Sequence, residues 1–285
     1  MHYTPSAPQK LARSHLLRNP DTFLLMGMGL GKTAAILDHH DTLLMTGENR
    51  AMLVVAPLAV CNLTWPNEVA KFSNFNQMRI ADLRTEEGQK QFTKGSAHIY
   101  TINWESLPTV AVLLAKQKSQ AVPYDMVVWD ESTKSKGPKS TRPAIYREYC
   151  PRVARQIAMT GTPAPNSEAD LWGQMMMVDG GKRLGPSFGN FQKVYFKPVD
   201  WNKYKWVLKD GAGERIYKRI SDVTLTLRTS DWLDLPDTVV NDVEVDLGSV
   251  LMSQYRQFED DLVTQIRDKV ITAPNAAALI TKLMQ

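Results

Sequence analysis

The sequence has few cysteines, no long apolar run and little net charge, and each of these absences argues against a class of protein. Its two cysteines, Cys61 and Cys150, lie far apart in 285 residues and match no metal-binding or redox spacing, so a disulfide scaffold is not expected. The longest nearly uninterrupted apolar run, residues 51–61, is broken by Pro57 and falls short of the ~20 residues that cross a bilayer. The first residues lack the basic and then apolar order of a secretory signal. We therefore expect a cytoplasmic protein with no membrane partner.

Charge is spread unevenly along a chain whose overall composition is that of a soluble globular protein. The balance of 34 Lys and Arg against 30 Asp and Glu gives a net charge of +4, too small by itself to indicate a nucleic-acid partner. Residues 182–219 nevertheless hold ten Lys and Arg against three Asp and Glu, and residues 221–261 hold ten Asp and Glu against two Arg. Aromatic residues are interleaved with the basic block. This mixture suits phosphate binding and base stacking, although a solvated helical face with its aromatics in the core explains the same pattern.

Short apolar runs predict the strands of a buried sheet. They occupy residues 22–26, 51–56, 97–102, 126–129 and 156–159. None shows strict alternation, which favours strands buried on both faces, as in a parallel sheet covered by helices. The intervening segments 58–72 and 104–118 are long enough for crossover helices. The pattern predicts a doubly wound α/β domain, in which ligands bind at the carboxyl ends of the strands.

A glycine-rich segment follows the first predicted strand and leads into an apolar helix. It reads Met26-Gly27-Met28-Gly29-Leu30-Gly31-Lys32-Thr33, which departs from the general phosphate-loop pattern only in having Met26 at the leading glycine. Glycines let the backbone wrap an anion, and the helix N-terminus adds unpaired N–H groups. Lys32 is then expected at the β- and γ-phosphates and the Thr33 hydroxyl at Mg²⁺. A glycine-rich turn with a chance Lys-Thr pair is the alternative.

Two carboxylates and a hydroxyl-rich turn follow later strands. Asp130 and Glu131 come directly after the run 126–129, where we assign Asp130 to the metal and Glu131 to the attacking water. Thr160-Gly161-Thr162-Pro163 follows the next run, with hydroxyls placed to bond the carboxylate pair. A solvated surface pair and a plain turn are the alternatives to these two assignments.

Together these segments resemble helicase superfamily 2, in its Swi/Snf-like branch of double-stranded-DNA translocases. Residues 28–33 resemble the phosphate loop of that branch, 53–58 with Trp65 and Glu68 its motif Ia, 102–107 its motif Ib, 127–134 its motif II and 160–166 its motif III. Upstream, Tyr3-Thr4-Pro5 with Gln9 resembles the adenine-reading Q motif. Motif II of the family usually reads Asp-Glu-Ala-His, whereas this chain has Ser132 and Thr133 after the carboxylates. The form of motif Ib is similar to bacterial or phage versions.

The resemblance implies ATP and Mg²⁺ as cofactors and double-stranded DNA as a weakly and non-specifically bound partner. The implied ATP-binding residues are Gln9, Met28, Gly29, Leu30, Gly31, Lys32 and Thr33. The implied catalytic residues are Lys32, Asp130 and Glu131, with Thr33 and Asp130 at the metal and Thr160, Gly161 and Thr162 in coupling. The expected DNA contacts are Pro57, Asn103, Lys134, Lys136, Lys139 and Arg142.

The implied fold is a RecA-like P-loop α/β domain with a central, mostly parallel sheet flanked by helices, plus a C-terminal helical and hinge extension. We expect an ATP-binding lobe over residues 1–180, a basic aromatic-rich extension returning to it over 181–230, and a hinge with the start of a second lobe over 231–285. The family's arginine fingers belong to that second RecA-like lobe, which is expected to be absent from this chain, so the chain alone should hardly hydrolyse ATP. Two other functions stay open: a nucleotide-binding adapter or decoy without turnover, and the motor part of a restriction–modification complex.

Overall fold

The computed structural model describes two compact parts of the chain. Its described residues are 1–116, 122–135, 153–164, 167–199, 205–234, 241, 248–261, 263–266 and 269–272. The first unit covers Met1–Asp234 and the second covers Leu235–Gln285. The second unit contains α10 (Gly248–Asp261) and an antiparallel pair formed by β10 (Val263–Ile266) and β11 (Lys269–Thr272). The expected boundaries at 180 and 230 stay predictions.

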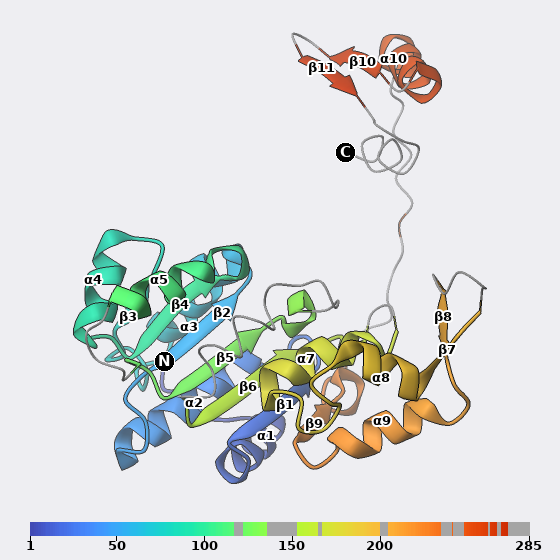
Figure 1. The fold of residues 1–285 in the computed structure, drawn as a ribbon. Helices are drawn as coiled ribbons and strands as arrows, with labels where there is room; N and C mark the ends of the chain where they lie inside the picture. Colours follow the sequence, from blue (N-terminus) through green and yellow to red (C-terminus); the bar gives the residue numbers. More distant parts are fainter. Residues whose placement is uncertain are drawn as a thin grey trace. The chain divides into compact units, whose positions relative to one another are not determined.

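A seven-stranded parallel sheet forms the centre of the first unit (Figure 1). Its strand order is β3-β4-β2-β5-β6-β1-β9. The strands are β1 (Asp21–Met26), β2 (Met52–Ala56), β3 (Ile80–Asp82), β4 (Ile99–Asn103), β5 (Met126–Asp130), β6 (Arg155–Thr160) and β9 (Thr224–Leu227). All neighbouring strands in this sheet pair in parallel. The predicted α/β class with a parallel sheet is confirmed.

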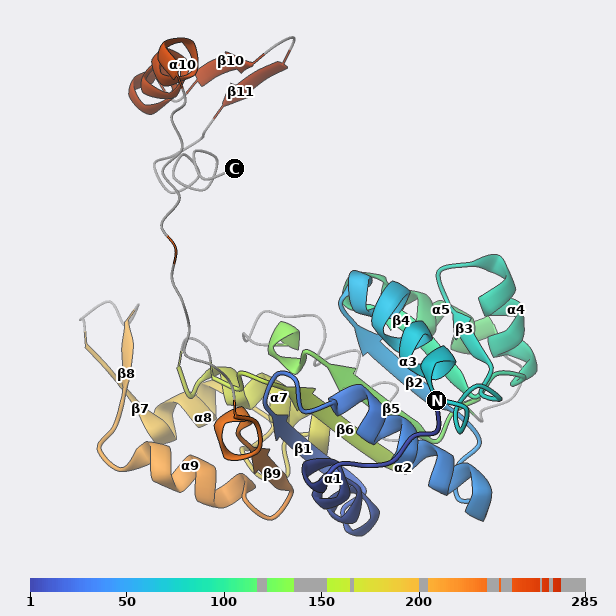
Figure 2. The ribbon, with the colours of Figure 1, turned by 180° about the vertical axis from the view of Figure 1, so that it is seen from behind.

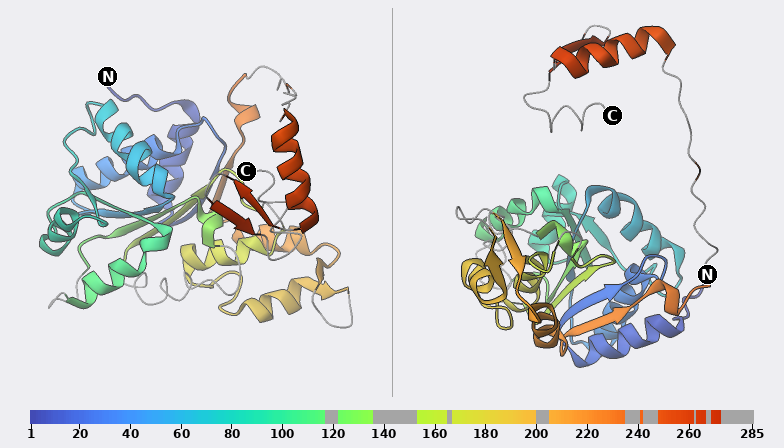
Figure 3. Two further views of the ribbon diagram at one scale, coloured as in Figure 1. Left: turned by 90° about the horizontal axis from the view of Figure 1, so that it is seen from above. Right: turned by 90° about the vertical axis from the view of Figure 1, so that its right-hand side faces the viewer.

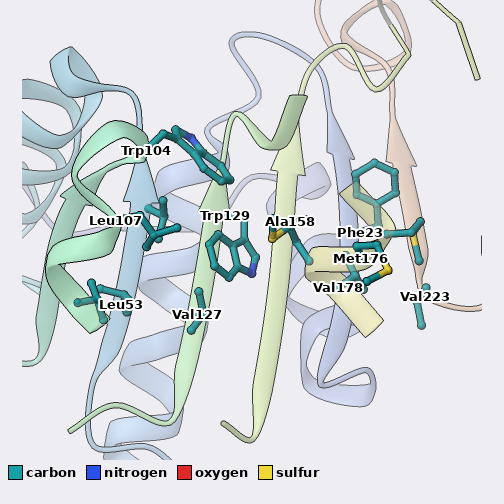
Figure 4. Packing of buried hydrophobic residues seen from close by; sticks show 14 of the residues in the cluster. Phe23, Leu53, Trp104, Leu107, Val127, Trp129, Ala158, Met176, Val178 and Val223 are labelled. Atoms are coloured by element: carbon teal, nitrogen blue, oxygen red, sulfur yellow. The ribbon is translucent and has the colours of Figure 1, made fainter. Parts of the chain in front are cut away.

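Helices cover both faces of the sheet, as Figure 2 and the left view of Figure 3 show. One face packs against α1 (Ala7–Arg18), α2 (Lys32–Thr46) and α3 (Trp65–Lys71) through a cluster that includes Leu24, Val54 and Val128. The other packs against α4 (Glu86–Lys94), α5 (Pro108–Lys116), α7 (Asp170–Asp179), α8 (Phe188–Tyr195) and α9 (Ala212–Ile220). Figure 4 shows part of this second layer, where Leu53, Val127 and Trp129 project from adjacent strands. Consecutive residues of one strand thus enter opposite cores, which explains the uninterrupted apolar runs.

Shorter elements complete the first unit. They are η1 (Val60–Thr64), η2 (Trp104–Ser106), η3 (Ser132–Ser135), η5 (Thr229–Asp231) and the antiparallel pair β7 (Phe196–Pro198) and β8 (Trp206–Leu208). Local capping sets several helix ends. Ser6 and Gln9 form a capping box at the start of α1, and the Thr85 side chain accepts a hydrogen bond from the Gly88 N–H at the start of α4. Within the described residues, no helix has both the length and the apolar character required to cross a bilayer.

Candidate active site

The glycine-rich segment forms a loop between β1 and α2. Gly29 and Gly31 have φ angles of +81° and +76°, in the left-handed region that glycine tolerates best. Gly31 is the N-cap of α2 and brings no side chain to that position, so the helix N-terminus faces the loop without a side-chain cap. Backbone N–H groups and the helix dipole at such an end favour an anion. The geometry is that of a phosphate-binding loop.

Two polar side chains donate hydrogen bonds to backbone carbonyls of the loop. Lys32 Nζ donates to the carbonyl oxygens of Met26 at 2.9 Å and Gly27 at 3.4 Å. Gln9 Nε2 donates to the Gly31 carbonyl at 3.3 Å, and Gln9 Oε1 accepts from the Ser6 N–H at 2.9 Å. A Cβ on Gly31 would overlap the Gln9 amide nitrogen, so a larger residue there would displace the Gln9 side chain from this position. The structure therefore brings Gln9, from the segment that resembles the Q motif, onto the phosphate loop.

The remaining loop residues differ in how far their side chains are exposed and available to a ligand. Met28 is 79% exposed, whereas Leu30 is 3% exposed and packs into the core beneath the loop. Leu30 can therefore offer only its backbone to a ligand. Thr33 is half-buried in the first turn of α2.

Asp130 ends β5 in a buried position, where each carboxylate oxygen accepts one hydrogen bond. Its Oδ2 accepts from the Trp65 indole N–H at 3.1 Å, its Oδ1 accepts from the Glu131 N–H at 2.9 Å, and its backbone oxygen accepts from the Trp104 indole at 2.9 Å. Burial raises the pKa of Asp130 to about 6, opposed by the Trp65 hydrogen bond and the Lys32 charge. The two tryptophans, from the segments compared with motifs Ia and Ib, thus fix Asp130: Trp65 holds its carboxylate and Trp104 holds its backbone carbonyl. Their role was not visible from sequence spacing.

Glu131 begins the next turn in an unusual backbone conformation. Its φ is +50°, which costs a residue with a side chain of order 1 kcal/mol. Glu131 Oε2 accepts from the Thr160 hydroxyl at 3.3 Å, and the same hydroxyl oxygen accepts from the Thr162 N–H at 3.2 Å. The hydroxyl that sequence reasoning placed beside the carboxylate pair is therefore Thr160, while Thr162 contributes its backbone.

The turn after β6 also reaches the phosphate loop. A Cβ built on Gly161 would lie 3.9 Å from Lys32 Nζ and 3.8 Å from the Met26 carbonyl oxygen. Because β5, β6 and β1 are neighbours in the sheet, their carboxyl ends gather the lysine, both carboxylates and the Thr160 turn at one edge. This convergence is what the sequence predicted for a ligand site.

Gln174 on α7 links the carboxylate turn to the Thr160 turn, and sequence reasoning missed it. Its Oε1 accepts from the Ser132 hydroxyl at 2.8 Å, and its Nε2 donates to the carbonyls of Pro163 and of Asp170, the latter at 3.1 Å. Gln174 is fully buried, and a buried polar side chain requires such partners. Ser132, which follows the carboxylates where the resembled motif usually has alanine, thereby gains a specific partner.

The residues expected to contact DNA are less uniform. Pro57 follows β2 and is half-buried, and Lys134 is exposed in η3. Asn103 ends β4 only 7% exposed, with its Nδ2 donating to Glu105 Oε2 at 2.9 Å. Lys136, Lys139 and Arg142 lie outside the described residues.

The donor set fits a nucleotide-bound Mg²⁺ better than a metal held by protein alone. Among the described residues, no three His, Cys, Asp or Glu side chains gather to hold an ion. Asp130 offers one carboxylate and Thr33 one hydroxyl, both oxygen ligands. Mg²⁺ commonly binds with one or two protein oxygens, phosphate oxygens and water. The residues present therefore fit the ion that the phosphate loop implies.

Comparison with known proteins assigns the family. The fold matches the SWI2/SNF2 ATPase core of Sulfolobus solfataricus in complex with double-stranded DNA, with a TM-score of 0.64 and 23% identity, over 100% of this chain and 57% of that chain. Protein p41 of Acyrthosiphon pisum secondary endosymbiont phage 1 is 32% identical over 295 residues, covering 99% of this chain and 63% of p41. A Mycoplasma pneumoniae protein named as an uncharacterized ATP-dependent helicase is 26% identical over 265 residues, covering 90% of this chain and 23% of the helicase. The chain thus spans less than two thirds of these relatives. A family model for the SNF2-related domain matches residues 15–285, and the chain belongs to that family.

Proposed function

We propose that this chain is the ATP-binding N-terminal motor lobe of a Swi/Snf-like, double-stranded-DNA-dependent ATPase. The observation that carries the proposal is the convergence of Lys32, Asp130, Glu131 and the Thr160 turn at the carboxyl ends of three adjacent strands. Family membership supports the same proposal, because the SNF2-related domain model matches residues 15–285, a range that contains all of these positions.

Each side chain has a distinct task in this proposal. Lys32 exchanges its two backbone carbonyl partners for phosphate oxygens when ATP enters the loop. Thr33 and Asp130 hold Mg²⁺, which neutralises charge on the phosphates when bound. Glu131, oriented by the Thr160 hydroxyl, takes the proton of the attacking water.

Efficient hydrolysis requires a second RecA-like lobe in this proposal. The positive charge that stabilises the transferring phosphoryl group is supplied by arginine fingers of that lobe, and lack of such an arginine lowers the rate on the order of 10³–10⁵-fold. Residues 1–285 alone are therefore expected to bind ATP·Mg²⁺ weakly and to hydrolyse it barely.

The proposed DNA contacts are to phosphates. Lys134 is exposed beside the carboxylate turn, and three further basic residues follow it closely in sequence, at positions 136, 139 and 142. Phosphate contacts give affinity without base specificity, so binding should be weak and largely independent of sequence. The phage relative supports a site of action in a bacterial host.

Paired substitutions test the roles in ATP turnover, in a polypeptide carrying both lobes. Lys32→Ala should weaken ATP binding, since Lys32 contacts phosphate in the ground state. Glu131→Gln should leave ATP binding unchanged and stop ATP hydrolysis, which is measured as the production of free phosphate. Lys90→Ala and Glu86→Gln, both exposed on α4, are the matched controls. If Glu131→Gln hydrolysed ATP at the normal rate, a residue other than Glu131 would activate the attacking water. ATP binding without turnover by the unaltered two-lobed protein would instead indicate an adapter.

A further inference from the structure

The edge strand β9 continues directly into contact with the phosphate loop. Leu227, the last residue of β9, pairs with Met26 of β1, and its carbonyl accepts the Gly27 N–H at 2.9 Å. Strand pairing therefore extends one residue into the loop. The short turn η5 begins two residues later, at Thr229, and lies close to the end of the first unit at Asp234.

Thr229 in this turn bonds the loop backbone. Its hydroxyl donates to the Met28 carbonyl oxygen at 2.9 Å. A Cβ on Gly27 would overlap the Thr229 hydroxyl and lie 2.8 Å from the Thr229 backbone nitrogen. A Cβ on Gly29 would lie 3.3 Å from Leu233 Cδ1. Residues 229–233 thus form one wall of the loop, with which two of its glycines are in close contact.

The bond to the Met28 carbonyl sets the direction of a neighbouring donor. In a planar trans peptide the carbonyl of one residue and the N–H of the next point to opposite sides. All peptide bonds of the described chain are trans. Holding the Met28 carbonyl toward Thr229 therefore turns the Gly29 N–H away from the turn. Gly29 is flexible, so without this bond the peptide plane can rotate and the N–H loses its orientation.

We propose that Thr229 is a positioning residue for phosphate binding, which orients the Gly29 N–H by holding the Met28 carbonyl. The proposal rests on the proposed function, because it assumes that ATP phosphates occupy this loop. Coupling between two sites is reciprocal. ATP in the loop therefore stabilises the turn, whose Trp232 and Leu233 N–H groups both donate to the Thr229 carbonyl, at 3.1 and 2.9 Å.

The test compares three variants of the full chain by calorimetric titration with ATP·Mg²⁺. Thr229→Val keeps the branched shape and removes the hydroxyl, and it should weaken ATP affinity about 3- to 10-fold, the effect of one hydrogen bond. Thr229→Ser keeps the hydroxyl and should stay within about twofold of the unaltered chain. Thr226→Val makes the same change at an exposed position of β9 and should leave affinity unchanged.

Amide hydrogen exchange on the unaltered chain gives a second and independent readout. ATP should slow exchange at Trp232 and Leu233, and Thr229→Val should remove that protection. Equal affinity of Thr229→Val and the unaltered chain would overturn the proposal while leaving the ATP site intact. Equal weakening by Thr229→Ser and Thr229→Val, or exchange at Trp232 and Leu233 that ATP does not change, would also overturn it. An unaltered chain that binds no ATP would defeat the proposed function itself, and this inference with it.

Discussion

Lowering the pH should destabilise the first unit, because α2 buries two neutral histidines. His40 Nδ1 faces Asn49 Nδ2 at 2.9 Å and His40 Nε2 faces the His98 carbonyl at 3.0 Å. Since an amide nitrogen donates and a carbonyl accepts, both contacts are satisfied only when His40 carries its single proton on Nε2. Among the described residues, His39 has no hydrogen-bond partner for either ring nitrogen. Both side chains are fully buried.

The size of the effect follows from the two pKa values. Burial lowers the pKa of His39 to about 3 and that of His40 to about 4, from 6.5. The folded state therefore binds fewer protons than the unfolded state, so this contribution to stability is fully present above the unfolded pKa and declines as the pH falls through it. At about pH 5 each histidine should lower the free energy of unfolding by about 2 kcal/mol. A domain is stable by only about 5–15 kcal/mol, so the combined effect is large.

Urea unfolding followed by tryptophan fluorescence at neutral pH and at about pH 5 measures this effect. His39→Leu removes one titrating ring and should reduce the fall in unfolding free energy by about 2 kcal/mol, whereas His2→Leu, at an exposed position, should leave the fall unchanged. Burial raises the pKa of Asp38, so protonation of this carboxyl at low pH favours the folded state and opposes the effect of the histidines. The quantity to compare is therefore the difference between the variant and the unaltered chain at each pH. An identical pH dependence in His39→Leu and the unaltered chain would refute the reasoning.

Two further predictions concern the phosphate loop and DNA. Gly31→Ala should weaken ATP binding, because alanine disfavours the left-handed backbone of the loop and its Cβ would displace the Gln9 amide, whereas Gly95→Ala, also left-handed but in open space, should lower stability only modestly. ATP titration and thermal unfolding of both variants separate the two effects, and normal ATP affinity in Gly31→Ala would contradict the loop geometry. Replacing three lysines by alanine should weaken duplex binding equally on unrelated sequences and flatten the salt dependence, whose log–log slope is about −0.9 per neutralised phosphate. The three are Lys134, Lys136 and Lys139. A salt titration of labelled duplexes measures both quantities. If the triple variant has the same affinity and salt dependence as the unaltered chain, the three lysines are solvent-exposed residues that do not contact DNA.

The sequence was sufficient to locate the central strands and the residues at their ends. All five predicted strands are present, because a strand buried on both faces produces a continuous apolar run that is visible locally. The two strands of the seven-stranded sheet that it missed lie at the edges of that sheet. β3 has only three residues, and β9 alternates Thr and Leu with partial exposure, so neither produces such a run.

The supporting contacts of the site could not be predicted in the same way. Trp65 and Asp130 are 65 residues apart, and Thr229 and Met28 are 201 residues apart. Such hydrogen bonds depend on how helices and turns pack over the sheet, and no local pattern encodes that arrangement. The role of Gln174 could not be predicted either, because its buried amide lies in an apolar helix whose sequence indicates only that it packs in the core.

The position of β9 has a consequence for preparing fragments of this protein. β1 has the apolar sequence Phe23-Leu24-Leu25-Met26, and β9 occupies its outer side at the edge of the sheet. A fragment that ended before residue 224 would leave the backbone N–H and C=O groups of β1 unpaired along that side. Exposed apolar edges of this kind template pairing with other chains and lead to aggregation. A soluble fragment of the first unit should therefore extend at least through Leu227, even though the phosphate loop, the carboxylates and the Thr160 turn all lie within the first 165 residues.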